Sequence, residues 1–190
     1  ARFSFKEALA QLPRGGPLGV ETLDAHGIAA KRASALVRSG WLLRLGRGAY
    51  ALPGDTLQRD DCLAFLAKQV PGLHVAGKTA LAWRGVRHNL AYRETVVLWG
   101  EQPARLPGWL DGVVRVRYRV AHIFGPDLPP GLGLAPLAGG HPDLPVSAPE
   151  RALLELLSET GSSEGLEEVR QLVESTRNLR LPLLDQLLGH

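Results

Sequence analysis

Residues 17–52 (PLGVETLDAHGIAAKRASALVRSGWLLRLGRGAYAL) constrain the fold more than any other stretch, because they combine two short helices with a glycine-closed hairpin. The first helix is predicted over Val20–His26, and Gly27 ends it, since glycine tolerates the left-handed conformation that follows many helices. The second helix is predicted from about Ala29 to Ser39 and is ended by Gly40. A tight turn between two such helices indicates a helix-turn-helix.

The second helix has two chemically different faces. Its apolar stripe, spaced i, i+3 and i+4, consists of Ala33, Leu36 and Val37. Its opposite face carries Lys31, Ser34, Ala35 and Arg38. This second face has two cations, a hydroxyl, a methyl and no acid, so it suits a negatively charged partner.

A basic hairpin follows the helix pair. Trp41–Leu45 is predicted as a strand with Arg44 on the side opposite its apolar residues, and Gly46–Gly48 turns the chain through Arg47 into the partner strand Ala49–Leu52. A helix-turn-helix followed by a basic hairpin is typical of a winged helix. Its second helix suits the major groove of DNA, and its wing suits phosphates or the minor groove. The alternative is a small helix-hairpin core with a solvated cationic face.

The charge distribution supports a polyanion partner for the first part of the chain. Residues 1–54 hold eight Lys/Arg and three Asp/Glu, a balance of +5, and residues 55–126 hold ten and six, a balance of +4. Residues 127–190 hold four and ten, a balance of −6, which gives the total of +3. The basic part coincides with the predicted winged helix.

The single cysteine, Cys62, cannot form an internal disulfide, so a reducing cytoplasm is the expected location. No apolar run approaches the ~20 residues that span a bilayer, and no signal peptide opens the chain. A membrane partner is therefore not expected.

The chain is predicted to form two domains and to belong to the α+β class. A helix over Phe3–Leu12, capped by Ser4, completes a winged helix-turn-helix domain at residues 1–54, and a small mixed α/β domain with C-terminal helices follows at residues 57–190. The predicted elements of the second domain are a helix at Asp60–Val70, a small-residue helix at GKTALAWRG, strands at Glu94–Trp99, Val113–Val120 and Leu144–Val146, a helical turn at Pro107–Asp111, and helices at Glu150–Ser158, Ser163–Ser175 and Pro182–Leu188.

The strand VVRVRYRV predicts a second cationic surface. Its alternation places Arg115, Arg117 and Arg119 on one face, over about 14 Å at ~3.4 Å per residue. Arg84 and Arg87 lie nearby in sequence and could extend this face. A solvated face is the alternative. A cluster of acids later in the chain, Glu164, Glu167 and Glu168, could dock on it or cap helices.

The segment SAPERALLELL predicts a capped helix. Ser147 is the expected cap, Pro149 lies in the first turn, and Glu150 lies three residues after the cap, as in a capping box.

The enzymatic alternatives have weak support. Gly72–Thr79 (GLHVAGKT) formally satisfies the phosphate-loop pattern, but a helix ending at Pro71 precedes it where a phosphate loop requires a buried strand. No Glu-x-Lys or Asp-x-Lys of a metal-dependent nuclease occurs, and the histidines and the one cysteine have no zinc-site spacing. No catalytic residue, metal or cofactor is therefore predicted.

Three stretches together resemble the AbiEi antitoxins of bacterial type IV toxin–antitoxin and abortive-infection systems. They are GWLLRLGRGAYAL, HVAGKTALAWRGVRH and LPVSAPERALLELL, which follow the family's order and spacing, and the resemblance covers most of the chain. The resemblance implies a winged-helix transcriptional regulator that represses its own operon and counters a co-expressed nucleotidyltransferase-like toxin. Relatives continue beyond the LLDQLL helix, so the chain is interpreted as a shortened relative or a fragment ending at His190.

The expected function is sequence-specific binding of double-stranded DNA at repeated half-sites in the protein's own promoter. The residues expected at the DNA are Lys31, Ser34 and Arg38 in the major groove, with Arg32, Arg44 and Arg47 on phosphates or the minor groove. The alternatives are a protein-interaction module that docks a toxin without specific DNA binding, and a nucleotide-dependent enzyme acting through Gly72–Thr79.

Overall fold

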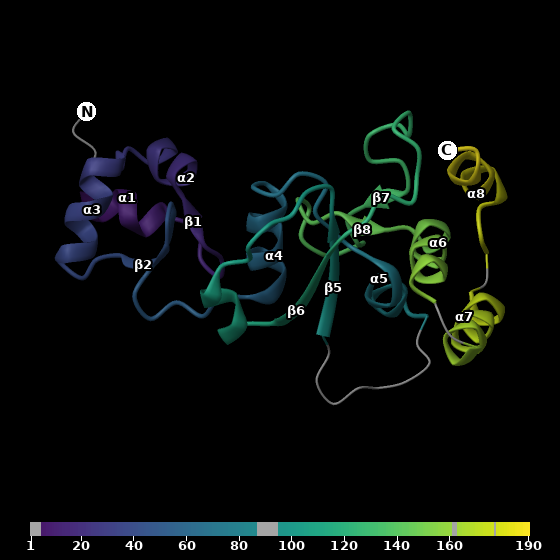
Figure 1. The fold of residues 1–190 in the computed structure, drawn as a ribbon. Coiled ribbons are helices and arrows are strands. Elements are labelled where there is room, and N and C mark those ends of the chain that lie inside the picture. The colour runs from purple at the N-terminus through teal and green to yellow at the C-terminus, as the bar shows by residue number, and fades with distance from the viewer. Residues whose placement is uncertain (1–4, 87–94, 161–162, 177) are drawn as a thin grey trace. The chain divides into compact units, whose positions relative to one another are not determined.

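The computed structural model describes residues 5–86, 95–160, 163–176 and 178–190, which form two compact units (Figure 1). Unit 1 contains the chain up to Phe65 together with Leu106–Val113. Unit 2 contains Leu66–Arg105 and Val114–His190. The mixture of helices and strands in both units confirms the α+β class.

Unit 1 has the element order of a winged helix-turn-helix. Its elements are α1 (Phe5–Gln11), β1 (Leu18–Gly19), α2 (Val20–Ala25), α3 (Ala30–Arg38), β2 (Leu43–Gly46), β3 (Ala49–Ala51) and the 3₁₀ turn η1 (Gly108–Gly112). The helix α4 (Arg59–Ala67) crosses from unit 1 into unit 2. The three strands form an antiparallel sheet in the order β1-β3-β2.

The two predicted helices of the helix-turn-helix are confirmed as α2 and α3. Gly27 and Gly40 follow them with φ of +73° and +77°, in the left-handed region that favours glycine. Their N–H groups donate to carbonyls of the preceding helices at 2.9 and 3.2 Å, so the ends of both helices are satisfied by the backbone.

The core of unit 1 is shared by its helices and its sheet. Its buried members are Ala8, Leu9, Leu12, Leu18, Leu23, Ile28, Ala33, Leu36, Leu42, Tyr50 and Leu52, with Val37 packed against them. On the hairpin, Leu42 points inward, whereas Trp41 and Leu43 are each 49% exposed. The apolar stripe predicted for α3 therefore faces the core.

The segment of η1 packs against unit 1 through Trp109. The Trp109 ring lies edge-on to Phe65 with ring centroids 6.3 Å apart. A Cβ atom placed on Gly46 would lie 3.6 Å from the Trp109 ring, so the tryptophan also covers the hairpin. These contacts explain why a segment distant in sequence belongs to unit 1.

Unit 2 is built on a five-stranded mixed sheet in the order β6-β5-β4-β8-β7. Its elements are β4 (His74–Val75), α5 (Gly77–Trp83), β5 (Thr95–Gly100), β6 (Arg115–Val120), β7 (Leu134–Ala135), β8 (Val146–Ser147), α6 (Pro149–Glu159), α7 (Ser163–Ser175) and α8 (Leu181–Leu188). The pairs β5/β6 and β4/β8 are parallel, and β4/β5 and β7/β8 are antiparallel.

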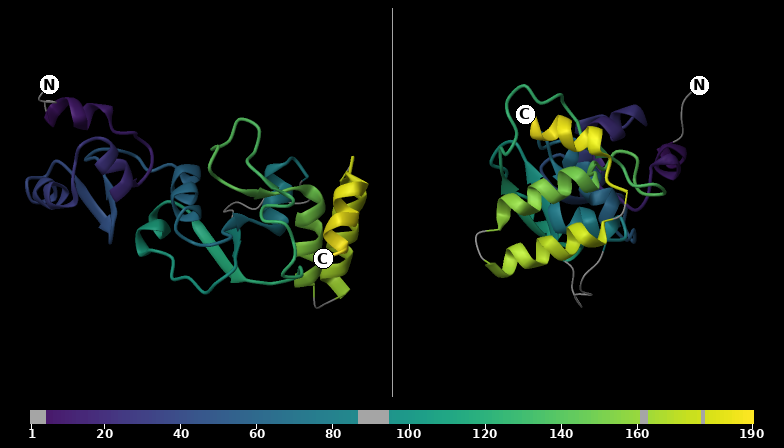
Figure 2. Two further views of the ribbon diagram at one scale, coloured as in Figure 1. Left: turned by 90° about the horizontal axis from the view of Figure 1, so that it is seen from above. Right: turned by 90° about the vertical axis from the view of Figure 1, so that its right-hand side faces the viewer.

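Helices cover the sheet of unit 2 in successive layers. Helix α5 packs on β5, where the Thr79 hydroxyl accepts a hydrogen bond from Val97 N–H at 3.0 Å. Helix α6 packs on α5, and α7 and α8 lie on either side of α6 (Figure 2). Strand β5 is buried on both faces beyond its first residue, as its apolar sequence predicts. Strand β6 alternates between exposed arginines and half-buried apolar residues, which confirms its predicted pattern.

The predicted capping box before α6 is wrong. The residue at the cap position is Ala148, and no side chain caps the helix. Ser147 lies in β8, so its hydroxyl reaches the buried side of α6 and donates to Glu155. Glu150 accepts hydrogen bonds from Arg180 instead of reaching back to the cap. Tertiary contacts thus take both side chains away from the helix end.

Candidate nucleic-acid interface and a buried carboxylate network

Helix α3 is held in unit 1 by its apolar side and presents its polar side outward. Ala33 and Leu36 are buried, and the helix ends where Trp41 N–H donates to the Leu36 carbonyl at 2.9 Å. The exposed side chains of the helix include Lys31, Arg32, Ser34, Ala35 and Arg38. This is the face that the sequence predicts.

The hairpin adds two further exposed arginines in the same unit. Arg44 lies on β2 at the start of a register shift, and Arg47 lies in the turn before Gly48, whose φ is +70°. Arg32 lies on the first turns of α3 and lines a hollow of about 500 Å³ together with residues of α1 and α2.

Four of these cations are not neutralised within the described structure. The side chains that form no hydrogen bond or ion pair with any described residue are Lys31, Arg38, Arg44 and Arg47. Since a charged group keeps its long-range field when no counter-charge lies beside it, α3 and the hairpin give unit 1 a positive surface.

The arginines of β6 have a different environment. Arg117 and Arg119 form ion pairs with Glu159 of α6 at 2.8 and 3.3 Å. The Arg119 guanidinium also lies 5.5 Å from the centre of the Trp99 ring, whose Nε1 donates to Glu159 at 3.2 Å. Arg115 is exposed. Among the described side chains, the acid that pairs with this face is therefore Glu159, which the sequence analysis did not single out, whereas the side chains of Glu164 and Glu168 lie outside the described ones.

Arg84 lies at the opposite edge of the same sheet. Its guanidinium donates to the carbonyls of Ser147 at 2.8 Å, Val146 at 3.1 Å and Ala135 at 3.2 Å, on β8 and β7. Burial and the nearby positive charge of Arg180 lower the pKa of Arg84, although Glu150 opposes this. The Arg84 guanidinium thus binds backbone carbonyls of β7 and β8, and it does not extend the cationic face formed by the β6 arginines. Arg87 lies outside the described residues.

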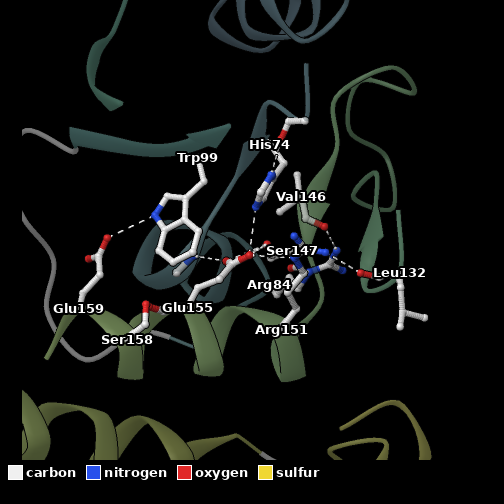
Figure 3. A network of polar contacts seen from close by, with 12 residues as sticks. His74, Arg84, Trp99, Leu132, Val146, Ser147, Arg151, Glu155, Ser158 and Glu159 are labelled. Atoms are coloured by element: carbon white, nitrogen blue, oxygen red, sulfur yellow. Dashed lines mark hydrogen bonds and ion pairs between the residues drawn. The ribbon is translucent and has the colours of Figure 1, made fainter. Parts of the chain in front are cut away.

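A buried carboxylate is the centre of a polar network in unit 2 (Figure 3). Glu155 of α6 is fully buried and accepts hydrogen bonds from three other elements and from Arg151 on its own helix. The donors and their distances are His74 Nε2 at 3.0 Å, Gly77 N–H at 2.9 Å, Ser147 Oγ at 2.9 Å and Arg151 Nε at 2.9 Å. The network therefore ties β4, α5 and β8 to α6.

Hydrogen bonds keep Glu155 ionised despite its burial. Burial raises the pKa of a carboxyl, but the hydrogen bond and charge of His74, the Gly77 N–H and the charge of Arg151 outweigh it, so the pKa of Glu155 is lowered. The sequence analysis missed this residue. Its signal is the position of an acid three residues after Ala152 on the apolar stripe of the helix.

The same network occupies the groups that a phosphate loop would use. In such a loop, backbone N–H groups and a hydroxyl bind phosphate and its magnesium ion. Here the Gly77 N–H donates to Glu155, and the buried Thr79 hydroxyl accepts from Val97. A carboxylate of the protein thus stands where the phosphate would bind, and the nucleotide-dependent alternative loses its basis.

In the described part of the chain, no group of three or more His, Cys, Asp or Glu side chains is arranged to hold a metal ion. None of the helices in that part is long and apolar enough to cross a membrane.

Comparisons with known proteins agree with this architecture. The chain is similar to the crystal structure of the RV2827C protein from Mycobacterium tuberculosis, with a TM-score of 0.53 and 22% sequence identity over 97% of this chain and 69% of that one. At this identity the similarity concerns the fold alone. A search of curated protein sequences gave no significant match.

Family comparisons cover nearly the whole chain. Residues 2–92 match the N-terminal domain of the AbiEi antitoxin transcriptional regulators. Residues 93–190 match the family described as transcriptional regulator, AbiEi antitoxin, type IV toxin–antitoxin system. These matches confirm the resemblance drawn from the sequence, and they imply DNA and a toxin as partners. The chain belongs to the AbiEi antitoxins, transcriptional regulators of type IV toxin–antitoxin systems.

Proposed function

We propose that unit 1 is the DNA-binding part of an autorepressor, with α3 in the major groove and the hairpin as a wing on the backbone or in the minor groove. The observation that carries this proposal is the set of four cations on α3 and the hairpin that no described residue neutralises. Such cations gain affinity by releasing counterions from DNA phosphates.

The proposed roles follow from position on the helix and the hairpin. Lys31, Ser34 and Arg38 lie on the exposed face of α3 and would meet base edges, where arginine pairs well with guanine. Arg44 and Arg47 would meet phosphates or the minor groove. Arg32, at the edge of the α3 face, would also meet phosphate.

Specific binding by this regulator is proposed to need two copies. A single DNA-binding module of this size buries only ~600–1,000 Å² of surface, which gives limited specificity. Repeated half-sites in the protein's own promoter would add the contributions of two modules. The protein would then act in the cytoplasm, where the promoter lies.

A gel-shift titration against the upstream DNA of the protein's own gene, at two salt concentrations, tests the proposal. We expect tight binding that resists competitor DNA and is lost in the double variant Lys31→Ala/Arg38→Ala. A matched control, Arg14→Ala/Arg105→Ala, removes two exposed cations outside α3 and the hairpin and should bind like the natural protein. Weak binding, or equal binding to any DNA, would reduce unit 1 to a general basic surface.

We further propose that unit 2 contributes the antitoxin activity against a co-expressed nucleotidyltransferase-like toxin. Exposed leucines on α8, Leu181 and Leu188, each 65% exposed, support a partner for this unit. The Lys31→Ala/Arg38→Ala variant, with both units present, separates the two activities. We expect it to lose promoter binding but still to restore growth of cells that express the toxin from an independent promoter. Loss of both activities would contradict a separate role for unit 2.

A further inference from the structure

Unit 2 contains a cavity of about 500 Å³ beside the carboxylate network. It lies where the parallel strands β5 and β6 end, and its lining includes Gly100 at the end of β5 and the residues after the two strands, Glu101–Gln102 and Ala121–Gly125. The crevice at the carboxyl ends of parallel strands is a general location of ligand sites in open sheets. The volume lies within the usual range of small-molecule pockets, ~300–1,000 Å³.

We propose that this cavity binds a small organic anion, a monophosphate or a carboxylate carried on an apolar or aromatic body. The side chains of His74 and Arg151 lie on the cavity wall, and both are held in place by contacts with Glu155.

His74 is held in place by two oxygen atoms. Its Nδ1 lies 2.7 Å from the Gly72 carbonyl oxygen, and its Nε2 lies 3.0 Å from Glu155 Oε1. Both oxygens only accept hydrogen bonds, because Glu155 is ionised and also accepts from Arg151. Both ring nitrogens are therefore occupied within the protein, and the orientation of the ring on the cavity wall is fixed.

Arg151 has one donor nitrogen left for a ligand. Its Nε donates to Glu155 at 2.9 Å, its Nη1 donates to the Leu132 carbonyl at 2.7 Å, and its guanidinium lies 4.9 Å from the centre of the Phe124 ring. Its Nη2 forms no hydrogen bond with any described residue. No buried side-chain nitrogen or oxygen in the described part of the chain lacks a partner, so Nη2 is accessible to solvent or a ligand.

A fixed guanidinium on the cavity wall favours an anion. Arg151 lines the cavity with its Nη2 unpaired by any described residue, and His122 also lies on the lining. The acid on the lining is Glu101, which is exposed. A guanidinium that is oriented by packing and by two hydrogen bonds loses little conformational entropy on binding a phosphate or carboxylate.

The rest of the lining is apolar and suits the body of such a ligand. Phe124 presents its ring beside Arg151, and the other apolar lining residues are Ile123, Leu128, Leu134, Pro129 and Pro130. An inorganic anion alone would leave this wall exposed to water. The ligand is therefore expected to combine one anionic group with an apolar part.

Isothermal titration calorimetry on the full chain, without DNA, tests the proposal with four probes. Phenyl phosphate and benzoate are the two anionic probes, and whichever binds more tightly shows whether the anionic group is a phosphate or a carboxylate. Benzyl alcohol tests the apolar body alone, and inorganic phosphate tests the anion alone. We expect saturable binding of one anionic aromatic probe, at least tenfold tighter than either partial probe.

Three variants locate the binding site of the tighter probe. Arg151→Lys keeps the charge but removes the free guanidinium donor, and Pro130→Trp adds bulk at an exposed position of the lining. We expect each to weaken binding at least fivefold. Arg115→Ala removes an exposed cation of β6 that does not line the cavity and should bind within twofold of the natural protein.

Several results would overturn the proposal. One is that neither anionic probe shows saturable binding at millimolar concentration. Another is that benzyl alcohol binds as tightly as the anionic probes. The third is that the affinity of the tighter probe is unchanged in the Pro130→Trp variant, a position that does not contribute to the carboxylate network. Because the measurement contains no DNA, its outcome is independent of the gel-shift test of unit 1.

Discussion

Two buried glutamates on α6 show how single residues hold unit 2 together. Glu155 joins β4, α5 and β8 to α6. Glu150, at the start of the same helix, accepts hydrogen bonds from the Arg180 N–H and guanidinium at 2.6 to 3.2 Å, just before α8. Removing one partner of a buried charge leaves the other charge without compensation, so such residues have large effects on stability.

We expect Glu155→Gln to lower the free energy of unfolding at pH 7 by about 3 kcal/mol, since a neutral amide replaces a buried carboxylate that faces the Arg151 guanidinium and the His74 ring. The pKa of Glu155 is lowered in the folded state, because its hydrogen bonds outweigh the effect of burial. The stabilisation is complete above the unfolded pKa of about 4.3 and is lost as the pH falls through the folded pKa.

Urea unfolding at pH 7, 5 and 3.5 measures this effect. The natural protein should lose more stability than the Glu155→Gln variant as the pH falls below about 5, so the two curves should converge. Parallel pH dependence of the two proteins would mean that Glu155 does not contribute through its charge.

Replacing Arg180, which pairs with the buried Glu150, should lower stability more than replacing Arg170, which forms an exposed pair. Arg180→Ala leaves the buried Glu150 with only a backbone donor and should cost about 2 kcal/mol. Arg170→Ala removes an exposed i,i+4 pair with Glu174 on α7 and should cost far less, because water screens that pair. Urea midpoints at pH 7 compare them. Equal losses would show that the buried carboxylate does not depend on the Arg180 guanidinium.

At the scale of elements, the helix-turn-helix and the hairpin are set by their glycines and by their apolar periodicity. Gly40 has φ +77°, and a Cβ atom added there would meet nothing within 4 Å. Its requirement is therefore conformational and not steric.

We expect Gly40→Ala to destabilise the protein by about 1–2 kcal/mol, the cost of a left-handed conformation for a residue with a Cβ. Gly108→Ala is the control, since Gly108 also has open space around its Cβ position but no positive φ. Thermal unfolding followed by circular dichroism measures both. A Gly40→Ala protein as stable as the control would show that the turn after α3 relaxes without cost.

The proposed wing predicts a change in salt dependence. We expect Arg47→Ala to weaken binding to all DNA sequences and to lower the slope of log K against log salt by ~1, the value for one phosphate contact. Titrations at four salt concentrations with promoter and unrelated DNA measure the slope. An unchanged slope would remove Arg47 from the phosphate contacts.

At the scale of the whole molecule, the chain divides into two compact units. The structure assigns residues up to Phe65 and Leu106–Val113 to unit 1, and the family domains meet at residues 92 and 93. The boundary predicted from the sequence, with domains at 1–54 and 57–190, stays a prediction. Residues Leu106–Val113 belong to unit 1 because Trp109 of η1 packs on the hairpin at Gly46. Such a contact between distant parts of the chain leaves no local pattern in the sequence.

The β6 face gives a prediction about DNA binding as a whole. Because Glu159 pairs with Arg117 and Arg119, we expect the double variant Arg117→Ala/Arg119→Ala to keep promoter affinity within about threefold and the salt slope within ~0.5. The gel shift described for unit 1 provides the measurement. A fall in slope by ~2 would instead establish this face as a second nucleic-acid surface.

The sequence by itself determined the local elements: α2, α3, the hairpin, β5 and β6 follow from apolar periodicity, glycine positions and alternation, which act between near neighbours. It also provided the exposed cationic residues of α3 and the hairpin. Only the tertiary structure decided that β1 pairs with β3, that Ser147 binds Glu155, and that His74 meets a carboxylate 81 residues away. Such partners are chosen by the order of strands in a sheet and by the packing of helices on it, so no local pattern predicts them.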